Sequence, residues 1–495
     1  MDKKIKIIQL KILLVILEIM LVLLIWTLVQ VVLLKRDEVA ERFRAPAEQA
    51  EEVMLFLEPE ETVSAVLPEP TPFVLTNFDK IRVVITNKET GGIYHESAEG
   101  WQEQRDYRGI IEVIEEEQGF VIINELPIEE YLYSVVPSEM PAGYPMEALK
   151  AQAICARTYA YLHVLSPGYP QWNAHVDDTT SYQVYHNIEE QESTTRAVNE
   201  TEGIVLLAPR EQALAQTYYY STSCGYGSDA RVWKSKYADS YPYIQSKHIS
   251  RLIDTDNSVV VSGQTIADTE KQPEHVEITN SEVEIYSSKA LTEAEFVDYI
   301  KTVNKEDFEA KEGWYRWNYR VEDLDVAYMQ EVLRKRYEAK PELILTKVGD
   351  DYISQPIGEF HTITHMEIGK RGAGGVAEEL LIHTDKAVYK VITELNIRYV
   401  LNDGCSPVKR QDGTTVERNS LLPSAFIVLE VIREDDLIIG YEIYGGGFGH
   451  GAGMSQNAAK VMAQEGMNAE EILTFFFTDC IVKDRSNGAE REGKE

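Results

Sequence analysis

One stretch near the N-terminus limits what this chain can fold into more than any other feature. The 23 residues from Ile12 to Leu34 are apolar apart from Glu18, Thr27 and Gln30. A helix of about 20 apolar residues spans the hydrocarbon core of a bilayer. The stretch is longer than the apolar core of a cleaved signal peptide, which is the alternative, and no A-x-A cleavage site ends it. We therefore predict that residues 1–36 form a cytoplasmic tip and a transmembrane anchor.

The charges beside this stretch predict its orientation. Lysines precede it at positions 3, 4, 6 and 11, whereas Lys35 and Arg36 after it are followed at once by acidic residues. Basic residues favour the cytoplasmic side of a membrane. We expect a single pass through the cell membrane, with the N-terminus in the cytoplasm and the bulk of the chain outside. Glu18 is costly inside a bilayer, so it lies near the headgroups, is protonated, or pairs with a partner helix.

Acidic residues dominate the composition. The chain has 48 Lys and Arg against 82 Asp and Glu, a net charge of −34. Nucleic acids and anionic bilayers both bind basic surfaces, so this charge argues against nucleic acid as the main partner and against peripheral membrane binding. Four cysteines in 495 residues are too few for a disulfide framework. The sequence contains no CxxC pair, which argues against a zinc ribbon.

Composition also divides the chain after the anchor. Residues 37–76 are acidic and contain several prolines, which is typical of an extended linker. Residues 77–483 have the alternation of short apolar runs expected of an α+β domain, with short β-sheets flanking a helical segment. Within it, residues 246–312 are rich in Ser, Thr, Asp and Glu and are predicted to be an insertion that contributes little to the core. Residues 484–495 form a charged tail.

Local patterns predict the order of the elements. Strands at 81–85, 109–113 and 119–123 are expected to form a small β meander, and strands return over 342–401. Within the insertion we expect a strand from His275 to Tyr286 and an acidic helix from Thr292 to Val303. Other helices are expected to begin at Pro127 and near Pro145, and to cover Leu324–Leu333, Ser455–Gln464 and Ala469–Phe477. A hairpin is expected from Phe426–Ile432 and Leu437–Tyr444.

The first segment that suggests chemistry contains Glu139, between Pro137 and Pro141. A residue before proline is pushed out of the helical region, so Met140 is expected to be extended and Glu139 to lie on a stiff link between two helices. The apolar neighbours of this carboxylate predict partial desolvation, which raises a carboxyl pKa and suits a general acid. The alternative is that Ser138 or Glu139 simply caps the next helix.

The second such segment has six glycines between Gly445 and Gly453 and contains His450. Glycines allow a backbone to approach a partner closely. The spacing matches neither a P-loop nor a dinucleotide-binding loop. His450 is an acid/base group, a ligand, or a core histidine bonded to the backbone. His361 and His365 lack the glutamate of a zinc-protease motif, and we expect no metal and no cofactor.

Taken together, these segments resemble the SpoIID/LytB family, the sporulation stage II protein D and amidase-enhancer proteins of spore-forming bacteria. The resemblance runs in the family's order from about Ile81 to Ile481, and PSEMP with GHGAGMSQ is its most specific pair of motifs. The matching stretches are Ile123–Tyr161, Asp177–Tyr185, Tyr220–Gly227 with Trp233, Asn396–Leu401, Leu422–Val428 and Gly445–Phe476.

The resemblance implies a membrane-anchored lytic transglycosylase of the cell wall. The catalytic acid of the family's lytic members matches Glu139, which would cleave the MurNAc–GlcNAc bond of peptidoglycan and leave 1,6-anhydro ends. Some members hold a zinc partly through two cysteines near the segment Asp177–Tyr185. The corresponding positions here are Val176 and Tyr182, so no zinc is expected. The family motif SQYGA reads Ser455–Ala459 (SQNAA) here, and Phe448-Gly449 replaces the usual Trp before GHG.

Residues around Glu139 are then expected to bind the glycan. The predicted substrate-binding residues are Tyr131, Tyr144, Arg157, His450, Ser455 and Gln456. Trp172 is a further aromatic that can stack on sugar rings, and each aromatic is equally compatible with the core. If the chemistry is hydrolysis, the second carboxylate is expected among Glu130, Asp177 and Asp178. The rival class is a non-catalytic, glycan-binding enhancer or scaffold of a wall amidase.

Overall fold

A computed structural model describes residues 79–87, 90–97, 106–185, 188–209, 213–234, 239, 241–251, 291–417 and 420–485. The predicted anchor and linker, the strand His275–Tyr286 and nearly all of the charged tail lie outside these residues. Within the described ranges, no helix is both long and apolar enough to cross a bilayer. The predicted α+β class is confirmed for the described part, which combines helices with five separate sheets.

The first sheet covers the N-terminal part of the domain. Its strand order is β2-β3-β1-β4, formed by β1 (Lys80–Ile85), β2 (Ile110–Glu116), β3 (Gly119–Pro127) and β4 (Val176–Asp177). The predicted strands are present, but β1 pairs with β3 and not with β2, so the arrangement is not a meander. The apolar residues Ile81, Val83 and Ile85 alternate along β1 and pack against two helices, which explains the choice of face.

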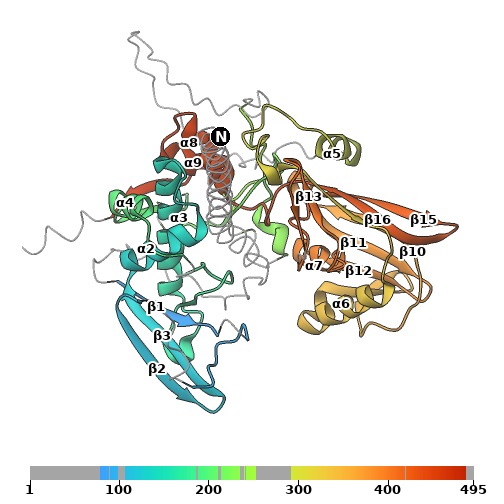
Figure 1. The fold of residues 1–495 in the computed structure, drawn as a ribbon, viewed down its shortest axis with the longest axis horizontal. Coiled ribbons are helices and arrows are strands. Elements are labelled where there is room, and N and C mark those ends of the chain that lie inside the picture. The colour runs from blue at the N-terminus through green and yellow to red at the C-terminus, as the bar shows by residue number, and fades with distance from the viewer. Residues whose placement is uncertain are drawn as a thin grey trace, which may run out of the picture. The chain divides into compact units, whose positions relative to one another are not determined.

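Those two helices begin where their prolines predict. Pro127 precedes α2 (Ile128–Glu139) and Pro145 precedes α3 (Met146–Leu165). Proline is well tolerated at a helix start because the first N–H groups have no partner in the helix. The helices pack on each other and on β1 (Figure 1). Two C-terminal helices, α8 (Gln456–Gln464) and α9 (Ala469–Phe476), return to pack against α3.

The strands between residues 317 and 445 form two five-stranded antiparallel sheets. The first has the order β10-β11-β12-β8-β9 and the second β14-β13-β7-β16-β15. Their strands are β7 (Trp317–Val321), β8 (Ile344–Val348), β9 (Asp351–Ser354), β10 (Ile363–Arg371), β11 (Ala377–Thr384), β12 (Val388–Ile392), β13 (Val408–Arg410), β14 (Thr415–Val416), β15 (Ile427–Glu434) and β16 (Leu437–Gly445). The β15–β16 pair is the predicted hairpin.

Shorter elements connect these sheets to the N-terminal part. Strand β5 (Ile204–Leu207) pairs antiparallel with β18 (Ile481–Asp484), and β6 (Tyr219–Tyr220) pairs parallel with β17 (Met454–Ser455). The remaining helices are α4 (Glu192–Glu200), α5 (Glu293–Ile300), α6 (Val326–Ala339) and α7 (Glu394–Val400), with single turns η1 (Pro170–Trp172), η2 (Ala230–Trp233), η4 (Gly313–Tyr315), η5 (Pro341–Leu343) and η6 (Ala373–Gly375).

Two local predictions are wrong. Residues 394–400 form the helix α7, although residues 342–401 were expected to be strands and turns. Pro137 lies inside α2, and Glu139 is the last residue of that helix instead of part of an irregular link. A proline near the end of a helix removes only one hydrogen bond. Met140 is extended, with φ −134° and ψ 130°, as Pro141 predicts.

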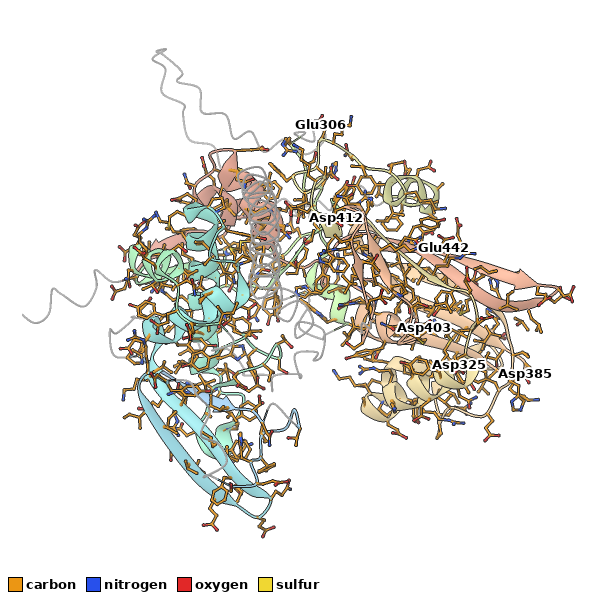
Figure 2. All side chains as sticks on the ribbon, in the orientation of Figure 1. Glu306, Asp325, Asp385, Asp403, Asp412 and Glu442 are labelled. Atoms are coloured by element: carbon orange, nitrogen blue, oxygen red, sulfur yellow. The ribbon has the colours of Figure 1, made fainter. Side chains whose placement is uncertain are left out.

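Acidic side chains are spread over the elements that follow α5. Glu306, Asp325, Asp385, Asp403, Asp412 and Glu442 lie on different elements of this region in Figure 2. Several of them are exposed. These six carboxylates are therefore distributed over this region and not gathered at one site.

The described flanks of the predicted insertion, residues 246–251 and 291–312, do not behave as an appendage. The predicted acidic helix is present as α5, and Thr292 closes its start with a capping box. Ile249, Phe296 and Ile300 are each at most 1% exposed. The expectation that 246–312 contributes little to the core is wrong for these flanks, because a polar composition concealed a few large apolar anchors.

A matched pair of substitutions tests this packing. Ile300 is 1% exposed and Val303, three positions later, is 50% exposed. Ile300→Ala is expected to lower the free energy of unfolding by about 2–5 kcal/mol, because it leaves a cavity. Val303→Ala is expected to change it by about 0.5 kcal/mol or less. Urea unfolding of both variants measures the difference. Equal small losses of stability would show that this segment contributes little to the core.

Candidate active site

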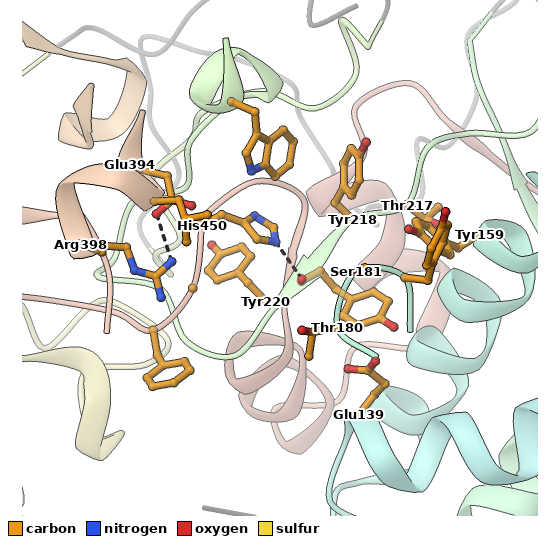
Figure 3. A pocket seen from close by; sticks show the side chains of 16 residues that line it. Glu139, Tyr159, Thr180, Ser181, Thr217, Tyr218, Tyr220, Glu394, Arg398 and His450 are labelled. Atoms are coloured by element: carbon orange, nitrogen blue, oxygen red, sulfur yellow. Dashed lines mark hydrogen bonds and ion pairs between the residues drawn. The ribbon is translucent and has the colours of Figure 1, made fainter. Parts of the chain in front are cut away.

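Glu139 lies at the C-terminal end of α2, and its side chain lines a pocket (Figure 3). The side chain is partly exposed. Its Oε1 accepts a 2.6 Å hydrogen bond from the backbone N–H of Val184. The Tyr219 hydroxyl also donates to the carboxylate. The local fold thus fixes the group from two directions.

Burial controls the protonation of this carboxyl. Desolvation by the surrounding protein raises the pKa of Glu139 to about 7, and the hydrogen bonds from Val184 and Tyr219 oppose the rise. A carboxyl with such a pKa carries a proton on a large fraction of molecules at neutral pH. Glu139 can therefore donate a proton to a molecule in the pocket and afterwards accept one.

The pocket is built from segments that are far apart in sequence. Besides Glu139, it is lined by Tyr159, Thr180, Ser181, Tyr182, Thr217, Tyr218, Tyr219, Tyr220, Trp233, Glu394, Leu395, Arg398, Phe448, Gly449 and His450. Aromatic side chains predominate. Aromatic faces with a few polar groups are suited to the alternating apolar and hydroxyl surfaces of sugar rings.

An ion pair lies on the other side of the pocket from Glu139 (Figure 3). Glu394 and Arg398 both come from α7, one turn apart, and their charged groups approach to 3.0 Å. The Arg398 Nε also donates to the carbonyl of Leu422 at 2.7 Å. Both side chains are at most 5% exposed. Glu394 thus forms an ion pair with Arg398, whereas no ion pair of Glu139 is found among the described residues.

The glycine-rich segment places its backbone directly on β6. Gly447, Gly449, Gly451 and Gly453 all have positive φ. A Cβ on Gly453 would lie 2.0 Å from the carbonyl oxygen of Tyr218, so only glycine fits. The predicted close approach is confirmed, and its partner is another strand of this chain.

His450 is a backbone-bonded histidine within this segment. Its Nε2 donates to the carbonyl of Tyr219 at 3.1 Å, and its Nδ1 accepts from the N–H of Ala452 at 3.1 Å. Burial lowers the pKa of His450 to about 3. The imidazole is therefore neutral. It lines the pocket, as predicted for a substrate-binding residue, but both ring nitrogens are engaged.

Of the three predicted binding residues Tyr144, Ser455 and Gln456, only Gln456 contacts Glu139. Gln456 Nε2 donates to the carbonyl oxygen of Glu139 at 2.9 Å. Ser455 is fully buried, and its hydroxyl donates to Glu309 at 2.7 Å. The Tyr144 hydroxyl donates to Asn457 at 2.5 Å. None of the three lines the pocket.

Tyr131, Arg157 and Trp172 lie in the core and not at the pocket, so the core alternative given for the two aromatics is the correct one and the predicted binding role of Arg157 is wrong. Tyr131 is 0% exposed, so neither face of its ring can stack on a sugar. Arg157 is also 0% exposed and forms two 2.7 Å hydrogen bonds with Glu129. Trp172 is 8% exposed and stacks on Tyr169. Their size and their polar tips had made them resemble groove residues.

The alternative carboxylates are held outside the pocket. Asp177 accepts from Thr179 and from the Tyr169 hydroxyl, the latter at 2.7 Å, and Asp178 accepts from Thr86. Glu130 approaches Arg108 to 3.8 Å. None of them lines the pocket. In the ranges that the structure describes, no cluster of three or more His, Cys, Asp or Glu side chains is arranged to hold a metal.

Some pocket residues were not predicted as site residues. The sequence 218–220 shows three tyrosines, which indicated only a strand. Trp233 and Arg398 lay in stretches noted for their family resemblance, with no role assigned. A Glu and an Arg four positions apart indicate a helical ion pair, and this was the one available signal for Glu394 and Arg398.

Comparison with known proteins identifies this architecture. The family model described as Stage II sporulation protein (SpoIID) matches residues 116–207, which contain α2, α3 and Glu139. The resemblance to the SpoIID/LytB family that the motifs predicted is thereby confirmed. A second model, Domain of unknown function (DUF8618), matches residues 239–453. The second match covers both five-stranded sheets and α7, so two family models meet at the pocket.

The chain is similar to two proteins with descriptive names and to one uncharacterised protein. The amidase enhancer of Bacillus subtilis is 25% identical over 347 residues, covering 70% of this chain and 39% of the relative. Stage II sporulation protein D of Bacillus amyloliquefaciens is 33% identical over 138 residues, 25% of this chain and 39% of the relative. An uncharacterised protein of Brachyspira hyodysenteriae is 32% identical over 192 residues, 37% of this chain and 49% of the relative. The chain thus spans about half or less of each relative.

The unusual protonation of Glu139 predicts an effect on stability. Its pKa of about 7 in the folded state lies above the ordinary 4.5, so between these pH values the folded chain binds more protons than the unfolded chain. Stability therefore falls as pH rises through this window. Glutamine does not titrate, so Glu139→Gln does not lose stability in this way. Its free energy of unfolding is expected to exceed that of wild type by about 1–3 kcal/mol at pH 8, and the difference should shrink toward pH 4.5.

Urea unfolding at pH 5 and pH 8 measures this difference. Glu130→Gln removes a carboxylate from the same helix without touching the pocket, and it should show no such gain at pH 8. A stability difference between Glu139→Gln and wild type that does not vary with pH would contradict the assigned desolvation.

Proposed function

We propose that this protein is a peptidoglycan lytic transglycosylase that acts in cell-wall remodelling linked to sporulation. The observation that carries the proposal is a single protonatable carboxyl, Glu139, facing an aromatic pocket with a pKa near 7. The names of two relatives, stage II sporulation protein D and amidase enhancer, support the cellular setting.

The proposed reaction uses Glu139 twice. Its carboxyl proton passes to the oxygen of the MurNAc–GlcNAc bond as the bond from C1 to that oxygen breaks. The carboxylate then accepts the proton of the C6 hydroxyl of the same MurNAc while that oxygen bonds to C1. The products are a GlcNAc hydroxyl end and a 1,6-anhydro end. No water is consumed, and Glu139 ends protonated as it began.

The arrangement of carboxyl groups supports a transglycosylase more than an ordinary hydrolase. Hydrolytic glycosidases use two carboxylates about 5–9.5 Å apart, one of them free to act as nucleophile or base. The other carboxylate that lines this pocket, Glu394, is ion-paired with Arg398. An internal nucleophile on the substrate removes the need for a second free carboxylate.

The chemistry predicts the consequence of one substitution. Glu139→Gln keeps the shape of the side chain but supplies no proton, so glycan cleavage is expected to fall by about 10²–10⁴-fold or more. Incubation of the full-length protein with purified glycan strands, followed by mass spectrometry for 1,6-anhydro ends, measures it. The wild-type rate should fall as pH rises through about 7, because the acid loses its proton.

Glu130→Gln is the matched control and should retain nearly wild-type cleavage, since Glu130 lies on the same helix outside the pocket. Products with reducing ends and no 1,6-anhydro ends would indicate hydrolysis instead. Retention of most activity by Glu139→Gln would remove this residue from the catalytic role.

A second candidate function is a glycan-binding enhancer of a wall amidase. The match to the amidase enhancer of Bacillus subtilis covers 70% of this chain, more than the match to stage II sporulation protein D covers. This function predicts that the wild type binds glycan strands without turnover and that adding it speeds a wall amidase. Glu139→Gln would then leave both effects unchanged.

We further propose that the protein acts from the outer face of the cell membrane, held there by the apolar stretch Ile12–Leu34. The lysines before this stretch favour an N-terminus in the cytoplasm. A cysteine at Ala65, in the acidic linker, is expected to react with an impermeant thiol reagent in intact wall-stripped cells. The same position in a chain whose lysines before Ile12 are neutralised is the control. Labelling of Ala65→Cys only after lysis would reverse the orientation.

A further inference from the structure

Glu309 is a fully buried carboxyl far along the chain from Glu139. Its exposure is 0%. Oε1 accepts a 3.0 Å bond from the N–H of Ser223 and a 2.7 Å bond from the Ser455 hydroxyl. The Ser223 hydroxyl bonds to Oε2. Three donors from two other segments therefore converge on one carboxyl group.

This burial is costly and is not offset by a cation. None of the ion pairs among the described residues includes Glu309. Glu312, three positions after Glu309 in the sequence, does have a cation, because it pairs with Lys460 at 2.6 Å. A buried carboxylate without a cation is destabilising, and desolvation accordingly raises the pKa of Glu309 to about 8. An apolar side chain would pack here at lower cost, so the polar group needs another explanation.

One partner of Glu309 lies on β17 and the other lies shortly after β6, and residues on or next to these two strands contact Glu139. Ser455 is the second residue of β17, and Ser223 follows β6 by three positions. In their parallel pairing, Met454 lies opposite Tyr219 and Ser455 opposite Tyr220. The Tyr219 hydroxyl donates a hydrogen bond to the Glu139 carboxylate. The side-chain amide of Gln456, the residue after Ser455, donates one to the backbone carbonyl of Glu139. Glu309 joins the two strands directly beside these contacts.

We propose that Glu309 is a positioning residue, which holds β6 and β17 together so that Tyr219 and Gln456 contact Glu139 from opposite ends. The inference rests on the proposed function for its catalytic consequence, but its structural content concerns Glu139 alone. It also gives a role to the segment after α5, which the second family model covers and the SpoIID model does not.

The hydrogen-bond pattern makes a decisive pair of variants available. Glu309→Gln reproduces the protonated carboxyl, because its carbonyl oxygen accepts the two bonds of Oε1 and its NH₂ group donates to the Ser223 hydroxyl. Glu309→Ala removes all three bonds. Asp307→Asn is the matched control: Asp307 is equally buried in the same segment, but its partners are His248, Asn304, Tyr299 and Tyr315 and not β6 or β17.

The first readout is the titration of Glu139 in the full-length protein. Carboxyl ¹³C shifts of glutamate-labelled chains, assigned by the signal lost in Glu139→Gln, give its pKa without any need for turnover. In Glu309→Ala the pKa of Glu139 should fall by about one unit, because water admitted between the loosened strands relieves desolvation, the largest cause of its present value. This effect outweighs the loss of the bond from Tyr219, which by itself would raise the pKa. Glu309→Gln and Asp307→Asn should leave it within about 0.3 units of wild type.

The second readout is cleavage of glycan strands. Glu309→Ala should lower kcat by about tenfold or more with KM changed by about twofold or less, since misplacement of the acid affects the chemical step. Glu309→Gln should restore kcat. Asp307→Asn should lose stability but retain the kcat of wild type per folded molecule.

The outcomes separate the two proposals. A Glu139 pKa that is the same in Glu309→Ala as in wild type would overturn the positioning role, whatever the activity. Equal kcat losses in Glu309→Ala and Asp307→Asn would also overturn it, since they indicate a general structural role. If the wild type shows no turnover, the catalytic function fails, and the titration alone still decides whether Glu309 positions Glu139.

Discussion

The parallel pairing of β17 with β6 is the contact on which the site depends. The ladder is only two residues long, and it forms because glycines at alternate positions allow the preceding backbone to lie against Tyr218 and Tyr220. The pairing delivers the Gln456 amide to the Glu139 carbonyl across 317 positions of sequence. It also places Tyr219 where its hydroxyl reaches the Glu139 carboxylate. The proposed acid, which α2 supplies, is therefore held by residues from two segments that are far apart in the sequence.

What the sequence predicted well was local. The prolines before α2 and α3 and Pro141 after Met140 each act on the neighbouring backbone, so their effect can be predicted without knowing the fold. Glu139 itself was accessible for the same reason, since two prolines and apolar neighbours surround it in sequence. Its helical position was missed because Pro137 sits close enough to the helix end to be tolerated.

What the sequence did not predict depends on contacts between distant segments. The run at 394–400 alternates polar with apolar residues over most of its length, a pattern typical of a strand, yet it forms α7 packed on β11 and β12. Asp307 and Glu309 lie within 246–312, the range predicted to contribute little to the core, and carboxylates are usually exposed. Each is buried because donors from other segments reach it. Conversely, Tyr131 and Arg157 were assigned to a groove, although their partners lie in the core.

The destabilisation of the folded chain by the Glu139 carboxyl at neutral pH helps to distinguish an enzyme from an enhancer. A desolvated carboxyl with a pKa near 7 destabilises the folded chain at neutral pH, and a glutamine could keep the bond from Val184 at lower cost. A protein that only binds glycan gains nothing from an acid whose proton is delivered into the pocket. Glu309 carries a similar cost but does not line this pocket, so proton transfer into the pocket does not explain it and a role in holding β6 to β17 does. The two desolvated carboxyls therefore favour catalysis when considered together, one as the proposed acid and the other as its support.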